Sequence, residues 1–209
     1  PTVAGWAGAD SAYGAGDLDG DGNDDLLLST GEVRLGPAYE SAAFRPTESL
    51  GTLSRSDGAL QVHDLLRFQD VDDDGQVDLL SPRVDGGLDV TFGPVGPGVT
   101  ILDTTATFSI RGDVLAWNGA AWPLDGDLLF VALPLLDHEA GRVYGFTVGA
   151  SPSRQDEAAV TLPCGTPGAR FGAGGTLVDL GGQAALVLVA PGEAGAIYDE
   201  GTTYTFMRP

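Results

Sequence analysis

The chain has 209 residues, enough to bury a substantial core as one large all-β domain or as two smaller domains. It carries 30 acidic and 10 basic residues, and the formal charge of −20 argues against nucleic-acid partners and anionic membrane surfaces, which both require basic patches. The longest apolar candidate, segment 128–136, is too short for a transmembrane helix.

The first predicted feature along the chain is an aspartate-rich loop, DLDGDGNDD, at residues 17–25. Carboxylates stand at its first, third, fifth and ninth places, glycine at the sixth, and the seventh residue offers a backbone carbonyl. The candidate ligands are Asp17, Asp19, Asp21, Asn23 and Asp25. Calcium takes six to eight oxygen ligands, and closely spaced aspartates around a glycine turn supply them. The loop therefore predicts a calcium site.

A second loop, DVDDDGQVD at residues 70–78, follows the same rule. Its candidate ligands are Asp70, Asp72, Asp74, Gln76 and Asp78. An EF-hand would need a glutamate at the twelfth place, where these loops have Leu28 and Ser81, so the EF-hand interpretation fails. Each loop instead runs into a short apolar stretch bounded by glycine or proline, which is typical of a strand.

Three strand patterns recur along the whole chain. A glycine opens a short alternating segment four times, in GEVRLG from Gly31, GLDVTF from Gly87, GRVYGF from Gly141 and GTTYTF from Gly201. An apolar strand precedes each one, in DLLLST, DLLSP, DLLFVALP and ALVLVAP, and YGAGD, RFQD, SIRGD and RFGAGG stand further upstream. This period of about 50 to 60 residues favours the blades of a β-propeller. We predict one all-β domain, 1–209, with repeats at 7–58, 59–104, 105–162 and 163–209.

The repeats resemble a known family. Tyr13-Gly14 and Phe171-Gly172 look like the opening of FG-GAP repeats, the blades of integrin α-subunit propellers, and Val189-Ala190-Pro191 resembles their second half. The two aspartate loops are similar to the calcium hairpins of that family. The resemblance covers nearly the whole chain and implies four-stranded blades, with calcium in the hairpin between the first and second strands.

The third and fourth repeats depart from this pattern. The third has the segment 113–127 in place of a calcium loop, and the fourth has DLGGQAA from Asp179 with a single carboxylate. Neither supplies enough oxygens for a calcium cage. The sequence therefore predicts two calcium ions rather than four. Because calcium is abundant outside the cell and suits open acidic sites, we expect a secreted or cell-surface protein.

The number of repeats raises the question of how four blades close, because the family usually has seven. Four blades can close alone, as haemopexin-like domains do, two chains can form an eight-bladed homodimer, or the chain is part of a longer array. Open arrays leave edge strands that invite pairing. The last repeat ends near its third strand, so a fourth strand must come from elsewhere, and residues 1–6 are the predicted donor. A two-chain ring is favoured, because seven or eight blades suit the repeat.

Enzymatic activity has little support in the sequence. The two histidines, His63 and His138, lie in connecting regions, Asp137 beside His138 is interpreted as a surface turn, and no GxSxG nucleophile elbow occurs. Cys164 is the only cysteine and is interpreted as a small, partly buried hydrophobe. The prediction is a protein without enzymatic activity.

Two binding functions remain open. The first is protein–protein adhesion or assembly through the propeller loops, with structural calcium. The alternative is a lectin-like propeller that binds a carbohydrate at blade junctions, where Trp117 and Trp122 would stack on the sugar unless they fill the space of the missing calcium loop. Arg111-Gly112-Asp113 spells a tripeptide that many integrins recognise, but its position in the repeat predicts the end of an inner strand. The partner is an unknown protein or glycan.

Overall fold

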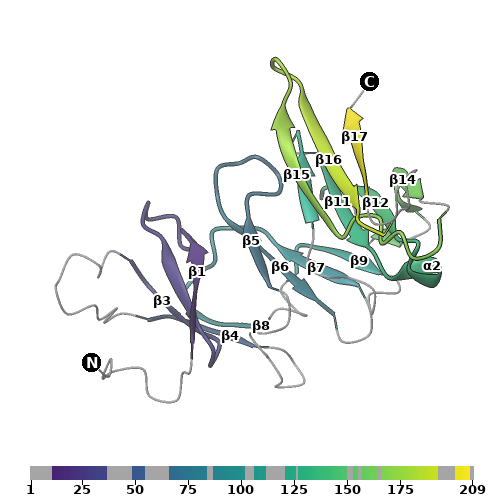
Figure 1. Ribbon diagram of the computed structural model, residues 1–209. Helices are drawn as coiled ribbons and strands as arrows, with labels where there is room; N and C mark the ends of the chain where they lie inside the picture. The colour runs from purple at the N-terminus through teal and green to yellow at the C-terminus, as the bar shows by residue number, and fades with distance from the viewer. Residues whose placement is uncertain are drawn as a thin grey trace, which may run out of the picture. The chain divides into compact units, whose positions relative to one another are not determined.

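The computed structural model describes residues 11–36, 49–54, 66–83, 87–101, 106–111, 121–125, 127–149, 153–154, 157–163, 166–192 and 201–207. These residues form strands β1 to β17 and one short helical segment, α2 (Leu136–Glu139) (Figure 1). Asp137 and His138 in α2 have left-handed φ angles of 53° and 61°, so α2 is a turn rather than a regular helix. Within the described ranges no helix is long and apolar enough to cross a membrane. The predicted all-β class is confirmed.

The strands are arranged in four mainly antiparallel sheets. The first sheet contains, in order, β1 (Ala12–Gly16), β2 (Asp25–Leu28), β3 (Glu32–Arg34), β4 (Ser49–Ser54) and β8 (Gly98–Ile101). The second contains β13 (Ser153–Arg154), β9 (Phe108–Arg111), β7 (Leu88–Thr91), β6 (Asp78–Pro82) and β5 (Arg67–Gln69). The third contains β10 (Ala121–Leu124), β11 (Leu128–Leu133), β12 (Arg142–Thr147) and β14 (Val160–Pro163). The fourth contains β15 (Gly174–Asp179), β16 (Ala184–Ala190) and β17 (Thr202–Met207).

The chain divides into two compact units. Unit 1 comprises residues 1–70, 75–81 and 89–107, and unit 2 comprises 71–74, 82–88 and 108–209. Unit 1 has a core in which Ala15, Leu27, Val33 and Leu53 of the first sheet pack with Leu79 of β6. The prediction of one closed propeller domain stays a prediction.

The core of unit 2 lies between the third and fourth sheets. Phe130 and Ala132 of β11 pack there with Leu186 and Leu188 of β16. The ring centroids of Phe130 and Phe206 are 5.1 Å apart. Phe130 lies opposite Gly145 across the β11–β12 pair, where a Cβ atom on Gly145 would stand 2.9 Å from the Phe130 ring. The glycine in this strand therefore makes room for the aromatic side chain.

The glycine that opens the third strand of each sheet has a conformational role. Gly31, Gly87, Gly141 and Gly201 all have positive φ angles, of 85°, 121°, 85° and 62°. Only glycine adopts this left-handed region without a steric penalty, so the recurring residue permits the turn between the second and third strands. The fourfold recurrence seen in the sequence thus corresponds to a glycine of positive φ before the third strand of each sheet.

One strand belongs to a different sheet than its sequence pattern predicted. The motif SIRGD aligns with the first strands of the other repeats, but β9 lies in the second sheet, between β13 and β7. The third sheet begins instead at β10. A short alternating strand has the same pattern whether it is the first or the last strand of a sheet, because only its non-local pairing distinguishes the two. Arg111 is exposed at the end of β9, and Gly112 and Asp113 lie outside the described residues.

Two parallel strand pairs extend the first and second sheets. β8 pairs in parallel with β4, although it lies in the connection between β7 and β9. β13 pairs in parallel with β9, although it lies in the connection between β12 and β14. In both cases a later connection adds the outermost strand of an earlier sheet. The sequence analysis did not predict either pair, since both segments stand inside connections.

The β4–β8 pair depends on a glycine, and this gives a first testable prediction. Gly51 lies opposite Gly98, and a Cβ atom on Gly51 would overlap the carbonyl group of Gly98. We expect Gly51→Ala to lower the free energy of unfolding by about 1–3 kcal/mol, the usual cost of forcing extra volume into a packed region. Chemical denaturation of the two proteins measures this loss.

Gly14 of β1 provides the control for this substitution. A Cβ atom there would meet nothing within 4 Å, so Gly14→Ala should leave stability almost unchanged. Equal stability losses in the two variants would contradict the importance of the close β4–β8 approach.

Candidate metal centre

The two aspartate loops occupy equivalent places in the fold. The first joins β1 to β2 in the first sheet, and the second joins β5 to β6 in the second sheet. The sixth-place glycines, Gly22 and Gly75, have φ angles of 90° and 84°, and the fourth-place residues, Gly20 and Asp73, have φ angles of 80° and 61°. The two loops therefore have left-handed residues at the same two places.

The first-place carboxylates organise both loops. Asp17 accepts hydrogen bonds from the backbone N–H groups of Gly20 (2.8 Å), Asp21 (3.0 Å) and Gly22 (2.7 Å). Asp70 accepts the equivalent bond from the N–H of the sixth-place Gly75, at 2.9 Å. Each carboxylate thus ties its turn together by accepting backbone N–H groups.

The ninth-place carboxylates are buried and anchor each loop to the end of a third strand. The Asp25 side chain accepts hydrogen bonds from the N–H groups of Leu18 (2.9 Å) and Gly36 (3.0 Å), and it is 1% exposed. Asp78, fully buried, accepts from the N–H of Gly93 at 2.9 Å. Gly36 follows β3 and Gly93 follows β7, so the two anchors are equivalent.

The environment of Asp25 is unfavourable for its negative charge. Burial raises its pKa above the ordinary value, the hydrogen bonds from Gly36 and Leu18 lower it, and the nearby charges of Asp19 and Asp17 raise it again. A cation bound among these carboxylates would offset both the burial and the repulsion.

Three carboxylates gather in each loop. Ligand atoms of Asp17, Asp19 and Asp21 lie within 4.8 Å of one another in the first loop, as do those of Asp70, Asp72 and Asp78 in the second. Oxygen-only donor sets of this kind fit hard divalent cations such as calcium. Asp25 and Asp74, which complete the two predicted ligand sets, do not belong to these three-residue groups.

The seventh-place residues have roles that the sequence pattern did not indicate. The backbone N–H and side-chain amide of Asn23 both donate to Asp21, at 2.8 Å and 3.0 Å. The side-chain oxygen of Gln76 lies close to Gly20, where an added Cβ atom would stand 2.8 Å from it. Gln76 and Gly20 both belong to unit 1, so Gln76 reaches from the second loop to the first. Backbone carbonyls of Asn23 and Gln76 as calcium ligands stay a prediction.

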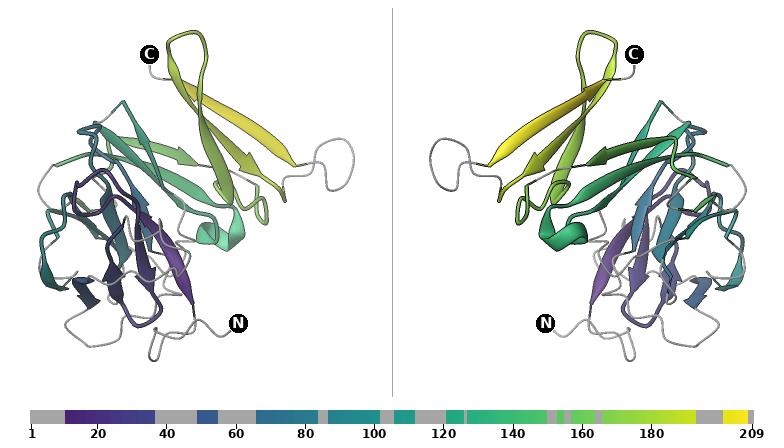
Figure 2. Two further views of the ribbon diagram at one scale, coloured as in Figure 1. Left: turned by 90° about the vertical axis from the view of Figure 1, so that its left-hand side faces the viewer. Right: turned by 90° about the vertical axis from the view of Figure 1, so that its right-hand side faces the viewer.

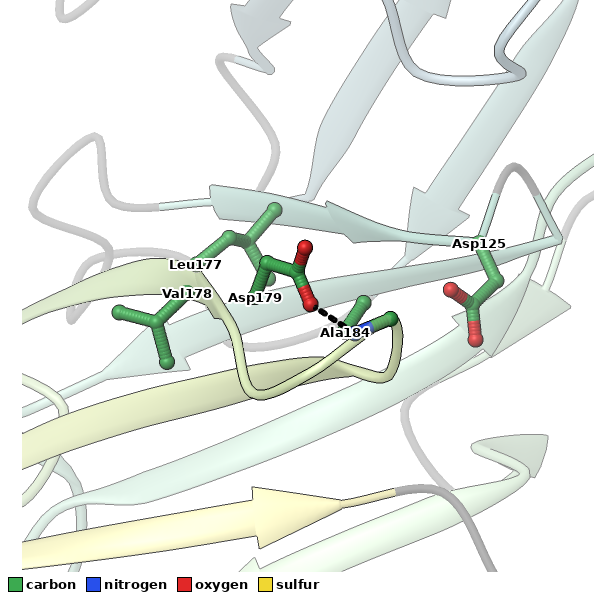
Figure 3. A pocket seen from close by; sticks show the side chains of 6 residues that line it. Asp125, Leu177, Val178, Asp179 and Ala184 are labelled. Atoms are coloured by element: carbon green, nitrogen blue, oxygen red, sulfur yellow. Dashed lines mark hydrogen bonds between the residues drawn. The ribbon is translucent and has the colours of Figure 1, made fainter.

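The corresponding turns of the third and fourth sheets have fewer carboxylates. Asp125 follows β10, and Asp179 ends β15, where its side chain accepts a hydrogen bond from the N–H of Gly182. They line a shallow hollow of about 390 Å³ together with Leu177, Val178, Gly182 and Ala184 (Figure 3). Among the described residues, the groups of three or more potential metal ligands are the two in the aspartate loops.

Within the described ranges, the other residues that the sequence analysis singled out form no further group of metal ligands. Trp122, predicted in a loop, lies in β10 and packs against the core of unit 2, because the strand alternation turns its ring toward the fourth sheet. Asp137 forms an ion pair with Arg142. Residues 1–6, His63, Trp117 and Cys164 lie outside the described residues.

Comparison with known proteins adds no assignment. The sequence matches no protein-family model. A search of curated proteins found no significant relative.

Proposed function

We propose that this chain is a calcium-binding, extracellular β-propeller module for protein–protein adhesion or assembly, in which two calcium ions have a structural role. The observation that carries the proposal is the equivalence of the two aspartate loops. Both join the first and second strands of a sheet, both have the same left-handed places, and both bond the first-place carboxylate to the sixth-place glycine. One ion in each loop is the simplest reason for two copies of so acidic a turn.

Each proposed ion would hold the carboxylates of one loop together and so stabilise the fold. Asp17, Asp19 and Asp21 would hold one ion, and Asp70, Asp72 and Asp78 the other. Asp25 and Asp74 complete the ligand sets in this proposal. Because Asp25 is bonded to Gly36 beyond β3, an ion in the first loop would stabilise the link between β1, β2 and β3. The buried, hydrogen-bonded carboxylates suit this role better than they suit catalysis.

The propeller architecture is supported by recurrence. Each sheet has antiparallel neighbours in the order first, second and third strand, and a left-handed glycine precedes each third strand. In the first three sheets a fourth strand, β4, β9 or β14, follows the third strand in the sheet order. This is the strand pattern of propeller blades and of the FG-GAP repeats that the sequence resembles.

An extracellular location follows from the chemistry of the proposed sites. Two ions would reduce the formal charge from −20 to about −16, so the protein would still be strongly acidic. Open loops with partly exposed ligands bind calcium weakly, and extracellular modules are filled at affinities of about 10⁻⁴ to 10⁻³ M. We therefore place the module outside the cell, where a partner protein would meet the propeller loops.

The test of this proposal is calcium stoichiometry. Titration calorimetry on the chelator-treated protein should give two calcium ions per chain, and saturation should raise the melting temperature. A ligand that binds only the folded state stabilises it by about 2.7 kcal/mol when present at 100 times its dissociation constant. Asp19→Ala and Asp72→Ala should each remove one ion, because each deletes a central carboxylate of one loop.

Asp125→Ala is the matched control, since it removes a carboxylate from the equivalent turn of the third sheet. It should leave two ions bound. A protein whose melting curve ignores both calcium and chelator, with no ion detected by elemental analysis, would exclude the calcium proposal.

The lectin-like alternative gains no support from Trp122, because its side chain packs against the core of unit 2 beside Gly175. We therefore keep a protein as the proposed partner. A glycan array with the intact protein and with Trp122→Ala tests this choice, and glycan binding that depends on Trp122 would reverse it.

A further inference from the structure

Two residues near the end of the second aspartate loop contact the first loop, and all four residues concerned belong to unit 1. A Cβ atom on Gly16, which ends β1, would stand 3.0 Å from the side chain of Val77. A Cβ atom on Gly20 would stand 2.8 Å from the side-chain oxygen of Gln76. The missing side chains of the two glycines thus allow the backbone of the first loop to approach the second loop closely.

A short segment after β7, residues 93–95, also connects the two loops, and we call it the link segment. At one end, the N–H of Gly93 donates to the Asp78 carboxylate of the second loop at 2.9 Å. At the other end, the N–H of Val95 donates to the backbone carbonyl of Leu18 in the first loop at 2.6 Å. The first loop itself joins β1 to β2, which are drawn in purple to indigo in both views of Figure 2. Each end of the link segment therefore bonds to one loop.

Leu18 occupies a central place in the first loop. It stands between Asp17 and Asp19, which are both candidate ligands of the first ion. Its N–H donates to the Asp25 carboxylate at 2.9 Å, while its carbonyl accepts the bond from the link segment. Any constraint on the two flanking carboxylates therefore acts directly on the residue to which the link segment is bonded.

The contacts around the link segment are tightly packed. Leu18 and Val95 are buried in the core of unit 1, and Val77 packs against the same core. A Cβ atom on Gly93 would stand 2.5 Å from the backbone oxygen of Val77. Because packed regions of this kind resist small displacements, a change in position at one end is transmitted to the other.

We propose that the two calcium sites are coupled through the link segment, so that filling one loop raises the calcium affinity of the other. This inference rests on the proposed calcium function and concerns the regulation of the same two sites. An ion held by Asp17 and Asp19 would fix Leu18 between them, and with it the segment that donates to Asp78. Asp78 is a candidate ligand of the second ion. The first ion would thus order part of the second site in advance, which gives positive cooperativity.

Repulsion between the two ions opposes this coupling. Each loop contains five aspartates, so it keeps an excess of negative charge when one calcium ion is bound. The remaining repulsion between the ions acts partly through solvent, where charges are screened within about 8 Å at physiological ionic strength. Ordering through direct contacts is not screened by salt. We therefore expect the coupling to be positive at physiological ionic strength and weaker at low salt.

The first test compares the binding constants of three proteins. Calcium chloride is titrated calorimetrically into the chelator-treated unchanged chain, into Asp72→Ala, which keeps the first site, and into Asp19→Ala, which keeps the second site. Independent sites would make the product of the two association constants of the unchanged chain equal to the product of the two single-site constants. Coupling should make the first product larger by about fivefold or more.

Gly93→Ala separates the link segment from the effect of charge, since the single-site variants each remove a carboxylate. The added Cβ atom would overlap the Val77 carbonyl group and should displace the link segment. When the three titrations are repeated with this substitution, the ratio of the two products should fall to about one. Gly96→Ala is the matched control, because a Cβ atom there would meet nothing within 4 Å. It should preserve the ratio.

The second test measures amide hydrogen exchange and needs no change in the link segment. In Asp72→Ala, calcium in the first loop should slow exchange of the Gly93 N–H. In Asp19→Ala, calcium in the second loop should slow exchange of the Leu18 N–H, because coupling is reciprocal. Each effect should be about fivefold or more. The N–H of Gly31, which bonds to a backbone carbonyl outside the link segment, is the control for a general stabilisation of unit 1.

The outcomes distinguish this inference from the proposal on which it rests. A chain that binds no calcium would exclude both. Two bound ions with equal products would overturn the coupling alone, and so would a ratio that Gly93→Ala and Gly96→Ala leave equally high. If Gly93→Ala fails to fold, exchange at Gly93 and Leu18 decides, and rates that change no more than the rate of Gly31 overturn the coupling.

Discussion

Replacing Asp25 with alanine should destabilise the protein even when calcium is absent. The Asp25 carboxylate accepts buried hydrogen bonds from the N–H groups of Leu18 and Gly36, and the alanine variant leaves both donors without this acceptor. A buried donor left without a partner costs about 1–3 kcal/mol. Removal of a charge whose pKa is raised by burial offsets part of this loss. We expect a net decrease of about 2–4 kcal/mol in the free energy of unfolding.

Asp25→Asn and Asp19→Ala separate the two roles of the loop. The asparagine variant keeps one oxygen acceptor and removes the charge, so it should lose less stability than alanine. Asp19→Ala should cost stability only when calcium is present, because this side chain belongs to the gathered carboxylates. Urea denaturation of all three variants, with calcium and with chelator, gives the comparison. If Asp25→Ala mattered only in calcium, the anchoring role of Asp25 would be wrong.

The sign of the pH dependence of Asp25 follows from the direction of its pKa shift. A carboxyl group whose pKa is higher in the folded than in the unfolded state favours folding when it is protonated. This contribution is present below the unfolded pKa and is lost as pH rises through the folded pKa. In the chelator-treated protein, ionisation of Asp25 therefore makes the fold less stable at neutral pH than it would be with this carboxyl protonated, and bound calcium should reduce that effect.

Replacing Phe130 with alanine should lower the free energy of unfolding by as much as Asp25→Ala does, or by more. The Phe130 side chain is fully buried in the core of unit 2, opposite Gly145 and 5.1 Å from the Phe206 ring. Gly145 cannot fill the space that the ring leaves. Truncation of a buried phenylalanine typically costs about 3–5 kcal/mol, because burial is lost and a cavity remains. Urea denaturation followed by circular dichroism measures the change.

Leu135→Ala is the control for this prediction, since Leu135 is 51% exposed. Substitutions of exposed residues usually change the free energy of unfolding by no more than about 0.5 kcal/mol. A loss below about 1 kcal/mol for Phe130→Ala would show that the core between the third and fourth sheets contributes little to stability.

The features that could be predicted from sequence are local ones. In both aspartate loops the carboxylates and the turn glycine lie within nine residues, so their spacing predicts that carboxylates gather there, although the three that gather differ between the loops. The glycine before each third strand is likewise a local requirement, since Gly31 and its three counterparts need a positive φ angle. The all-β class followed from the short alternating strands between these turns.

The features that could not be predicted are the non-local ones. The bond from Gly36 to Asp25 depends on where the chain returns after β3, and the sequence pattern contains no sign of it. Trp122 was predicted in a long loop because a four-residue strand containing proline is a weak pattern. The assignment of β9 to the second sheet, and the contact of Gln76 with the first loop, depend in the same way on pairing between distant segments.

The parallel pair between β4 and β8 has a consequence for how the chain folds. β4 belongs to the first repeat, but the strand that covers its outer side follows β7, late in the second. During synthesis the first sheet therefore stays incomplete until residue 101 has emerged. The second sheet likewise stays incomplete until β13, which pairs with β9, has emerged. Pairing between segments so far apart slows folding. Neighbouring repeats therefore exchange strands. A single repeat cut at its sequence boundary would lack a strand that its neighbour provides.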